Sequence, residues 1–428
     1  MSFKKHDRQY DVVVFGATGY TGLFTAEHIA AELPTNLRWA VAGRSAEKLQ
    51  NVVAECQKLN GDRQPPAVEI CNLNDEDLLQ LAKKTYILIS TVGPYAKYGE
   101  HAYKACAEAG THYLDCTGEA VWTYDMIKKY EATAKRTGAC LISQGGVESA
   151  PSDLLTLVLA QTLKKELSAD TGDVVVSFHT LKAQASGGTL ATALNLFQSY
   201  GLKEIDASHK PYALSPIKNS TPTPRASIWS MLTGLREVPL LGTLCTSVTS
   251  GTNAAIVFRS WGLAKSEAPL RKQFYGPNFT YREFMRPKSK LQGVLMHYGL
   301  IFGGIMLAFV PPFRELVRRF IYQPGQGPER EAAHKDYIEL RGVATPDFSA
   351  SGGPPPAGKP QQLAHVRGQY SGSMYLLTAM LLAQAALTIL EDDVPMSGGV
   401  YTPASLGQGF VDRVHEHGFK VEAEIVDV

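Results

Sequence analysis

Three glycines separate an apolar run from a helical pattern near the start of the chain. The stretch "VVVFGATGYTGLFTAEHIA" holds Gly16, Gly19 and Gly22 at G-x-x-G-x-x-G spacing. A glycine turn lets backbone N–H groups approach a ligand closely, and the helix that follows adds a dipole that attracts anions. The spacing therefore predicts a pyrophosphate site. A strand-to-helix turn without any ligand can have the same composition, so the neighbouring elements must decide between the two.

Basic residues follow the second apolar run, "LRWAVAGRS". It ends in Arg44 and Ser45, and Lys48 comes one helical turn later. In many dinucleotide sites an Asp or Glu at this position binds the ribose 2′-hydroxyl. A guanidinium at the same place can grip a 2′-phosphate with two hydrogen bonds. The missing carboxylate favours NADPH over NADH, whereas the alternative is a solvated surface arginine. Asn72, after the third run, is placed to contact the adenine.

Buried strands and helices alternate around the glycine turn. We expect strands at residues 10–16, 37–45, 66–71, 85–93, 111–116 and 138–143. Helical patterns lie between them at residues 21–33, 46–59, 75–83, 99–109 and 121–137. This order predicts a Rossmann-type, doubly wound parallel sheet in residues 1–150, with the glycine turn at its first strand-to-helix crossing. The turn that ends the fourth strand then belongs near the nicotinamide; it contains Thr91, Val92, Gly93 and Pro94.

The rest of the chain contains further strands and helices without an internal repeat. Strand patterns occur at residues 173–183, 247–263 and 363–370, and helical patterns at residues 186–197 and 373–391. Residues 210–227 are rich in Pro and Ser and are predicted to be a loop. We therefore expect a second domain over residues 151–400, followed by a C-terminal helix and strand in residues 401–428.

Nine stretches along the chain resemble one known family. They are "GATGYTG", "AGRS", "STVGPYAKYGE", "GTHYLDCTGE", "GGVESAPSDL", "SGGTLATAL", "YGPNFTY", "PGQGP" and "YTPASLGQGF". Together they resemble the saccharopine dehydrogenase-like oxidoreductases over nearly the whole chain. The sequence is most similar to the branch that includes the trans-acting enoyl reductases. The resemblance implies a Rossmann-type α/β domain, an inserted α+β domain with a mixed sheet, and a last helix that returns to the first domain.

The same resemblance implies a cofactor and its site residues. Trans-acting enoyl reductases reduce an α,β-unsaturated thioester made by a separate polyketide synthase, and other members of the branch associate with membranes or lipid droplets. NADPH/NADP+ is the implied cofactor. The family's cofactor positions match Gly16, Ala17, Thr18, Gly19, Tyr20, Thr21, Gly22, Arg44 and the turn from Thr91 to Pro94. Asn72 departs from the family, where an Asp is common, and this weakens only the adenine assignment.

Candidates for proton transfer stand where the strands of the first sheet end. Hydride transfer needs little beyond a fixed cofactor and a proton donor or polarising group near the product. Tyr95, Tyr98 and Glu119 are the predicted catalytic residues. Glu119 has an alternative, structural interpretation as a helix cap, and the same holds for Asp153. The remaining candidates at this edge are Asp115, Cys116 and Ser149.

Other kinds of chemistry find little support in the sequence. Tyr124 and Lys128 have the Tyr-x-x-x-Lys spacing of short-chain reductases, but they precede the sixth strand on a surface-like helix, so we reject this pair. No His-x-x-x-His motif or cysteine cluster predicts a metal site, and we expect none. A hydrolase nucleophile elbow, G-x-S-x-G, is also missing. Reduction with a nicotinamide cofactor is the chemistry that remains.

Residues 291–313 contain no Asp, Glu, Lys or Arg, and basic residues flank them on both sides. A membrane-spanning helix needs about 20 apolar residues, and Pro311 and Pro312 end the helical part early. An interfacial helix on anionic lipid fits this pattern better than a span. A buried helix or a dimer interface is the alternative. An apolar surface of this kind suits an acyl chain better than a zwitterionic amino acid.

Composition limits the possible partners and locations of the protein. A net charge of +1 over 428 residues gives no sign of a nucleic-acid partner, and the six scattered cysteines predict reduced thiols in the cytoplasm. We expect a homodimer that is cytoplasmic or peripheral on a membrane or lipid droplet. The leading hypothesis is an NADPH-dependent reductase of the C=C bond of an apolar or carrier-bound acyl substrate. The alternatives are a C=N reductase or amino-acid dehydrogenase, and a non-catalytic NADPH-binding protein on a membrane or droplet.

Overall fold

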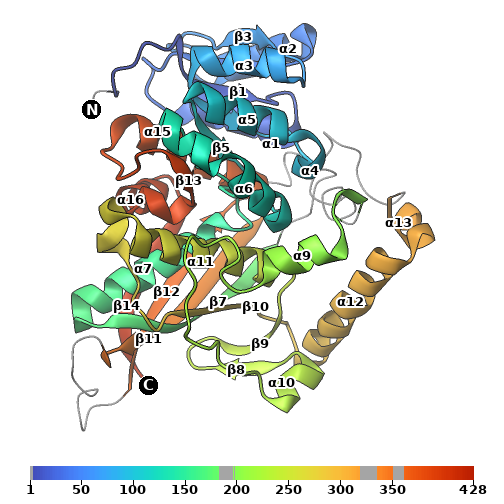
Figure 1. Cartoon of the computed structure of the whole chain (residues 1–428), viewed down its shortest axis with the longest axis vertical. Helices are drawn as coiled ribbons and strands as arrows, with labels where there is room; N and C mark the ends of the chain where they lie inside the picture. Colours follow the sequence, from blue (N-terminus) through green and yellow to red (C-terminus); the bar gives the residue numbers. More distant parts are fainter. Residues whose placement is uncertain (1–2, 183–195, 197, 319–334, 350–360) are drawn as a thin grey trace.

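Two seven-stranded sheets share one core. The computed structural model describes residues 3–182, 196, 198–318, 335–349 and 361–428. Figure 1 shows the first sheet with its helices at one end of the molecule and the second sheet beyond it. Helix α7 (Ala150–Leu167) joins the sheets. One cluster of buried apolar side chains includes Val14 of the first sheet, Leu155 of α7 and Val366 of the second sheet, so the two parts fold around a common interior.

The first sheet is parallel, in the order β13-β6-β5-β4-β1-β2-β3. Its strands are β1 (Tyr10–Phe15), β2 (Trp39–Gly43), β3 (Ala67–Ile70), β4 (Thr85–Ser90), β5 (His112–Asp115), β6 (Cys140–Ile142) and β13 (Gly399–Tyr401). Its helices are α1 (Tyr20–Glu32), α2 (Ala46–Leu59), α3 (Asp75–Lys84), α4 (Tyr95–Tyr98), α5 (Glu100–Ala109) and α6 (Ala120–Thr137). The order β3-β2-β1-β4-β5-β6 is that of a Rossmann fold, which confirms the predicted fold class. All six residues of β1 are buried, as expected for a β-branched strand covered on both faces.

The second sheet is mixed, in the order β14-β12-β11-β7-β10-β9-β8. Its strands are β7 (Asp170–Lys182), β8 (Arg236–Val238), β9 (Gly242–Thr246), β10 (Thr280–Met285), β11 (Tyr337–Asp347), β12 (Gln362–Ser371) and β14 (Lys420–Asp427). Strands β7 and β10 are parallel and the other pairs are antiparallel. The mixed sheet that the family resemblance implied is therefore confirmed. The helices of this region are α9 (Leu202–His209), α10 (Ile228–Thr233), α11 (Ser250–Ser266) and the 3-10 turn η1 (Ala268–Gln273).

Helix α11 corrects one prediction, because residues 247–263 were expected to form a strand. Nearly all side chains from Thr252 to Ala264 are buried. An element that is buried on every side shows neither the helical nor the strand period, so local pattern cannot separate the two. The predicted helix at residues 186–197, with its motif "SGGTLATAL", lies outside the described residues apart from residue 196, and so does "PGQGP".

The chain returns to the first sheet earlier than the predicted boundary at residue 401. Helix α15 (Met374–Glu391) lies along α1, and β13 pairs with β6. The turn η3 (Pro403–Leu406) and helix α16 (Gln408–Glu416) follow, and α16 packs on α15. Strand β14 then goes back to the second sheet beside β12. Residues 374–427 therefore tie both sheets together.

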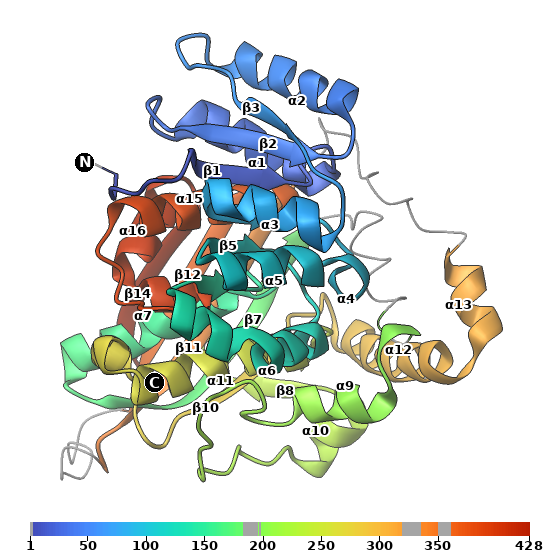
Figure 2. The ribbon, with the colours of Figure 1, turned by 45° about the horizontal axis from the view of Figure 1, so that its top comes forward.

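Helices α12 (Lys290–Phe309) and α13 (Pro311–Arg318) project away from both sheets in Figures 1 and 2. The start of α12 is anchored, because His297 hydrogen-bonds Thr246 Oγ1 at 2.8 Å and the Tyr298 hydroxyl donates to the Leu232 carbonyl at 2.7 Å. Farther along, no described atom lies within 4 Å of a Cβ placed on Gly303 or Gly304. The second half of α12 thus has no neighbour among the described residues on that side.

Candidate cofactor and active site

The glycine turn after β1 is too tight for side chains at two of its three glycines. Gly16 has a φ of +88°, a conformation that side chains rarely adopt. A Cβ on Gly22 would lie 2.2 Å from the Gly16 carbonyl oxygen. Gly19 differs, since its φ of −80° is open to any residue and its Cβ would lie 3.2 Å from that oxygen. The left-handed conformation in this turn is therefore at Gly16 and not at Gly19.

Helix α1 begins at Tyr20, directly after this turn. No side chain caps its N-terminus, and its first turn has no acidic residue. The cradle formed by residues 16–22 therefore fits a pyrophosphate, which would meet N–H groups of the first helical turn and the positive end of the helix dipole. Ala17, Thr18 and Thr21 complete this stretch.

Residues at the ends of β2 and β3 lie at one side of the glycine turn. Arg44 and Lys48 are exposed, and no hydrogen bond or ion pair holds the Arg44 guanidinium within the described part of the chain. Ser45 caps α2 by accepting from the Lys48 N–H at 3.4 Å. Asn72 donates from its backbone and its side chain to Asp77 Oδ2, both at 2.9 Å, so its side-chain oxygen is the group left for an adenine. Arg44 is thus available for a phosphate.

The turn after β4 contacts the glycine turn from the other side. The Thr91 N–H and hydroxyl both donate to the Phe15 carbonyl, at 2.9 and 3.1 Å. A Cβ on Gly16 would lie 2.7 Å from Val92 Cγ2. Gly93 is exposed, and Pro94 is the residue before α4. The predicted cofactor residues on β1 and β4 are therefore brought together at the carboxyl ends of adjacent strands.

Two of the three predicted catalytic residues have structural contacts. The Tyr95 hydroxyl donates to the Ser90 carbonyl at 2.8 Å, and Tyr95 is only 5% exposed. Glu119 accepts the N–H groups of Tyr95 and Ala96 at 2.7 and 2.8 Å, so it caps α4. Burial raises the pKa of Glu119 to about 7. Tyr98 is half-buried, with the Lys97 ammonium over its ring. A catalytic role for these residues stays a prediction.

The other acidic candidates hold backbone turns in place. Asp115 Oδ1 accepts the N–H groups of Thr117 and Gln144 at 3.0 and 2.9 Å. Asp153 accepts from the Ser260 hydroxyl at 2.6 Å and the Ala404 N–H at 2.8 Å. Asp153 therefore links α7 to α11 and η3. These contacts agree with the structural interpretation.

Helix α15 supports the site in a way that the sequence did not indicate. Tyr375 stands edge-on to the ring of Tyr20 at 4.9 Å, and the Thr378 hydroxyl accepts the Val147 N–H at 3.1 Å. The first contact fixes the start of α1, and the second fixes the segment after β6. The nearly continuous apolar composition of α15 was the available signal, because a helix without a polar face is buried in a core or in lipid.

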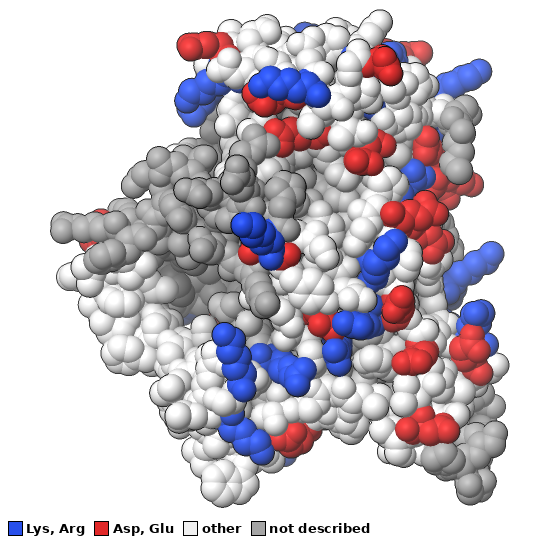
Figure 3. Space-filling view, turned by 180° about the vertical axis from the view of Figure 1, so that it is seen from behind, with Lys and Arg blue, Asp and Glu red and all other residues white. Residues whose placement is uncertain are grey.

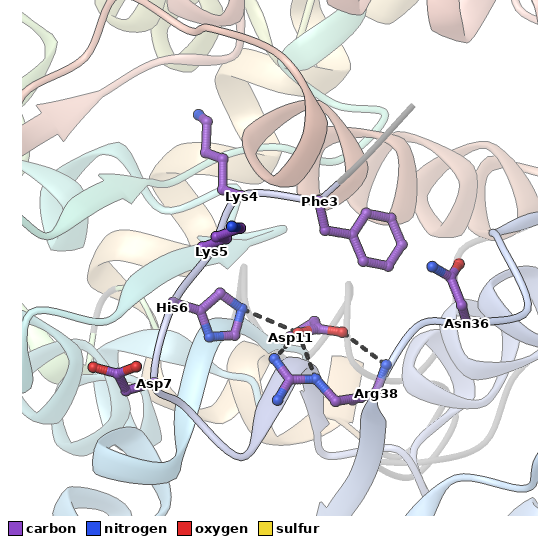
Figure 4. Close-up of a pocket in the computed structure, with 8 residues that line it drawn as sticks. All are labelled: Phe3, Lys4, Lys5, His6, Asp7, Asp11, Asn36 and Arg38. Carbon is purple, nitrogen blue, oxygen red and sulfur yellow. Dashed lines mark hydrogen bonds and ion pairs between the residues drawn. The ribbon is translucent and has the colours of Figure 1, made fainter.

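A hollow at the amino-terminal end of β1 is separate from this edge (Figure 4). Its charged centre is Asp11, which accepts the Arg38 N–H at 2.8 Å and contacts His6 Nε2 at 3.0 Å. The Arg38 guanidinium also donates to Asp11. These contacts join the N-terminal segment to β1 and to the residue before β2. We therefore assign them a structural role.

The fold and the residues at the carboxyl edge of the first sheet define an NADP-binding oxidoreductase. Residues 12–142 match the family model of the saccharopine dehydrogenase NADP binding domain. The saccharopine dehydrogenase-like oxidoreductase of Rattus norvegicus is 30% identical over 446 residues, covering 96% of this chain and 97% of the relative. The protein therefore belongs to the saccharopine dehydrogenase-like oxidoreductase family, and its cofactor is NADPH/NADP+.

Two further comparisons agree with this assignment. A protein of Mycobacterium ulcerans named trans-acting enoyl reductase is 29% identical over 434 residues, covering 97% of this chain and 98% of the relative. The apo saccharopine dehydrogenase (L-Glu forming) of Saccharomyces cerevisiae matches with a TM-score of 0.54 and 11% identity, over 97% of this chain and all of that one. The second similarity shows the shared fold alone.

Replacing Arg44 with Ala should weaken the binding of NADPH but not the binding of NADH. A hydrogen bond to a charged group contributes about 1.5–3 kcal/mol, so NADPH affinity should fall about ten- to a hundredfold while NADH affinity changes little. Titration of cofactor fluorescence measures both. Lys58→Ala, at the far end of α2, is the matched control and should leave both affinities unchanged. Equal losses for NADPH and NADH would contradict the assignment of Arg44.

Proposed function

We propose that this protein reduces the C=C bond of an apolar acyl thioester with NADPH, in trans to the polyketide-type synthase that makes the substrate. The full-length similarity to a protein named trans-acting enoyl reductase supports this reaction. The observation that supports an apolar substrate is the large apolar surface on α10, α12 and α13. An acyl chain has no strongly bound water to lose on such a surface. A zwitterionic substrate would have to give up its hydration there.

Different residues at the carboxyl edge of the first sheet bind different parts of NADPH. The turn at residues 16–22 and the start of α1 hold the pyrophosphate, and Arg44 binds the 2′-phosphate. The turn from Thr91 to Pro94 orients the nicotinamide half. NADPH, when bound, supplies the hydride that goes to the β-carbon of the substrate. The protein must then deliver a proton to the α-carbon and keep bulk water away from the reacting atoms.

The exposed apolar surface, which we call the apolar arm, comes from three helices. Trp229 on α10 is 75% exposed and Phe302 on α12 is 65% exposed. In Figure 3 the part of this projecting edge that is not grey is mostly uncharged. The large apolar residues of the arm with more than a third of their surface exposed are Ile228, Trp229, Met231, Leu232, Leu291, Leu295, Tyr298, Ile301, Phe302, Ile305, Phe309 and Leu316.

We propose that the apolar arm holds this cytoplasmic protein on the surface of a membrane or lipid droplet. Helices α12 and α15 are both long and apolar enough to cross a membrane, but 83% of the apolar window of α15 is buried and only 6% of that of α12. A helix that is apolar on all sides belongs in a core or in lipid. Lys288, Lys290 and Arg314 flank the arm and can contact anionic headgroups. Membrane binding would also place the enzyme beside acyl substrates.

The alternative reaction, reduction of a C=N bond, needs cationic groups for substrate carboxylates. The second sheet does present arginines on neighbouring strands. However, Arg282 pairs with Asp173, and Arg341 and Arg367 both pair with Glu339. These ion pairs offset part of the positive charge, but Arg341 and Arg367 share one carboxylate, and Arg236 and Arg286 have no carboxylate partner within the described residues. The substrate panel below therefore decides between the two reactions.

Turnover on a panel of substrates tests the proposed function. NADPH oxidation should be fastest with long-chain enoyl thioesters, slower with short ones, and undetectable with 2-oxo acids plus amino acids. Product analysis by mass spectrometry should show a gain of two hydrogens. Tight NADPH binding without turnover on any enoyl thioester would instead support the non-catalytic alternative. Turnover with 2-oxo acids and amines would support C=N reduction.

A further inference from the structure

Glu148 is a carboxyl group that none of the preceding assignments uses. It lies in the segment "GGVES", between β6 and α7. The backbone there is held from two sides, since the Asn253 side chain donates to the Glu148 carbonyl at 2.8 Å and Thr378 accepts the Val147 N–H. Ser149, the next residue, hydrogen-bonds both Gln144 and Asn253 through its hydroxyl. The position of Glu148 is therefore fixed without help from its own side chain.

The Glu148 carboxylate itself has no hydrogen bond or ion pair with any residue that the structure describes. It lies flat against Gly118, where an added Cβ would come within 2.2 Å of Oε2 and 2.9 Å of Oε1. The neighbouring carboxylates differ. Glu119 accepts two backbone N–H groups, and Glu283 accepts from Ser152, Asn253, Thr249 and Tyr281. A half-buried carboxyl group without a partner is costly unless it is protonated or has a ligand.

Among the described residues, two carboxyl groups act against a negative charge on Glu148, namely Glu283 from β10 and Glu119 before α6. The Cys116 thiol after β5 is also near, and burial keeps it neutral. Desolvation by burial, followed by repulsion from Glu283 and Glu119, raises the pKa of Glu148 to about 7. Part of the population is therefore protonated at neutral pH. A general acid works best when its pKa is near the working pH.

The strand order places Glu148 at the carboxyl edge of the first sheet, on the side where the nicotinamide half of the cofactor binds. Arg44 and Asn72 follow β2 and β3, on one side of the glycine turn after β1. The nicotinamide half must extend the other way, over the ends of β4 and β5. Glu148 follows β6 and touches Gly118 in the turn after β5. It is the unpaired carboxyl group at this end of the edge, within the described residues.

We propose that Glu148 is the catalytic acid that protonates the α-carbon of the substrate. The inference rests on the proposed enoyl reduction. The hydride and its electron pair go from NADPH to the β-carbon, and the C=C π pair moves to the α-carbon. That carbon takes the proton of the Glu148 carboxyl group, which leaves NADP+, a saturated thioester and a Glu148 carboxylate. Solvent then returns a proton to Glu148, so each turnover consumes one NADPH and one H+.

The first experiment compares turnover with NADPH binding in Glu148→Gln. This change keeps the shape of the side chain and removes its acidic proton. We expect kcat to fall about a hundredfold or more, the range typical of a lost general acid, with NADPH affinity within twofold of wild type. Wild-type kcat should fall as pH rises through about 7, because only the protonated acid donates, and the variant should lose this dependence. Glu148→Asp should recover part of the rate. Glu166→Gln, an exposed change on α7, is the matched control.

The second experiment measures the protonation of Glu148 directly and does not depend on turnover. Difference infrared spectra of the protein with and without NADP+ are recorded for wild type and Glu148→Gln, and one is subtracted from the other. The subtraction should leave a carboxyl band that titrates near pH 7, because it removes the bands of Glu119 and Asp153, whose pKa values burial also raises to about 7. The absence of such a band from the subtracted spectrum, or a variant kcat within threefold of wild type, would overturn the proposal for Glu148. A wild type that reduces no enoyl thioester, with the Glu148 signal present, would overturn the proposed function and the proton transfer with it. The protonated state of Glu148 would then still be established.

Discussion

Gly19→Val should abolish NADPH binding in a protein that still folds. Gly19 is the residue before α1, and its φ of −80° suits a β-branched residue. The valine side chain would stand where the pyrophosphate approaches the N–H groups of α1. Loss of even two charged hydrogen bonds at about 1.5–3 kcal/mol each predicts an affinity loss of a hundredfold or more. Fluorescence titration with NADPH gives the affinity, and thermal unfolding reports on the fold.

Gly19 is a cleaner probe than the other glycines of the turn. A substitution at Gly16 would be strained by its positive φ, and one at Gly22 would collide with the Gly16 carbonyl oxygen. Both changes would damage the fold and the site together. Gly61→Val, on a surface loop with open space around it, is the matched control. Normal NADPH binding by the Gly19 variant would show that the phosphate binds elsewhere.

Replacing Leu300, Ile301, Phe302 and Ile305 together with Ser should abolish binding to liposomes and leave thermal stability nearly unchanged. The second half of α12 contacts little of the described structure, so these side chains contribute little to the core. Wild-type protein should float with anionic liposomes, less with neutral ones and less at high salt, because basic residues flank the arm. Flotation and the melting temperature are the two measurements.

Helix α15 offers a matched control, since it is as apolar as α12 but buried. Leu377→Ala and Leu381→Ala, with both side chains fully buried, should each cost about 2–5 kcal/mol of stability. The four serines in α12 should cost far less. If they instead lower the melting temperature sharply or dissociate a dimer, α12 is a core or dimer-interface helix. A wild type that never floats would also reject the membrane proposal.

The sequence by itself determined the first domain and the cofactor class. Most strands there are short apolar runs, several helices have local start or stop signals, and the glycine spacing marks the crossing between β1 and α1. Such information lies within about ten neighbouring residues, so it can be interpreted without the fold. The helix at Ala46–Leu59 has the bounds that its pattern predicts. Arg44 likewise indicates the 2′-phosphate from its place after one strand.

Only the tertiary structure decided features that depend on distant segments. Helices α12 and α15 have similar hydropathy, yet one is exposed and the other buried, because α1 covers α15 and no described element covers the outer half of α12. The sequence of helix α11 shows no helical hydrophobic period, because other elements cover the helix on all sides. The carboxylates Glu119, Glu148 and Asp153 are chemically alike in sequence. Their roles differ because backbone N–H groups reach Glu119 and Asp153, while no hydrogen-bond donor among the described residues reaches the Glu148 carboxylate, which lies against Gly118.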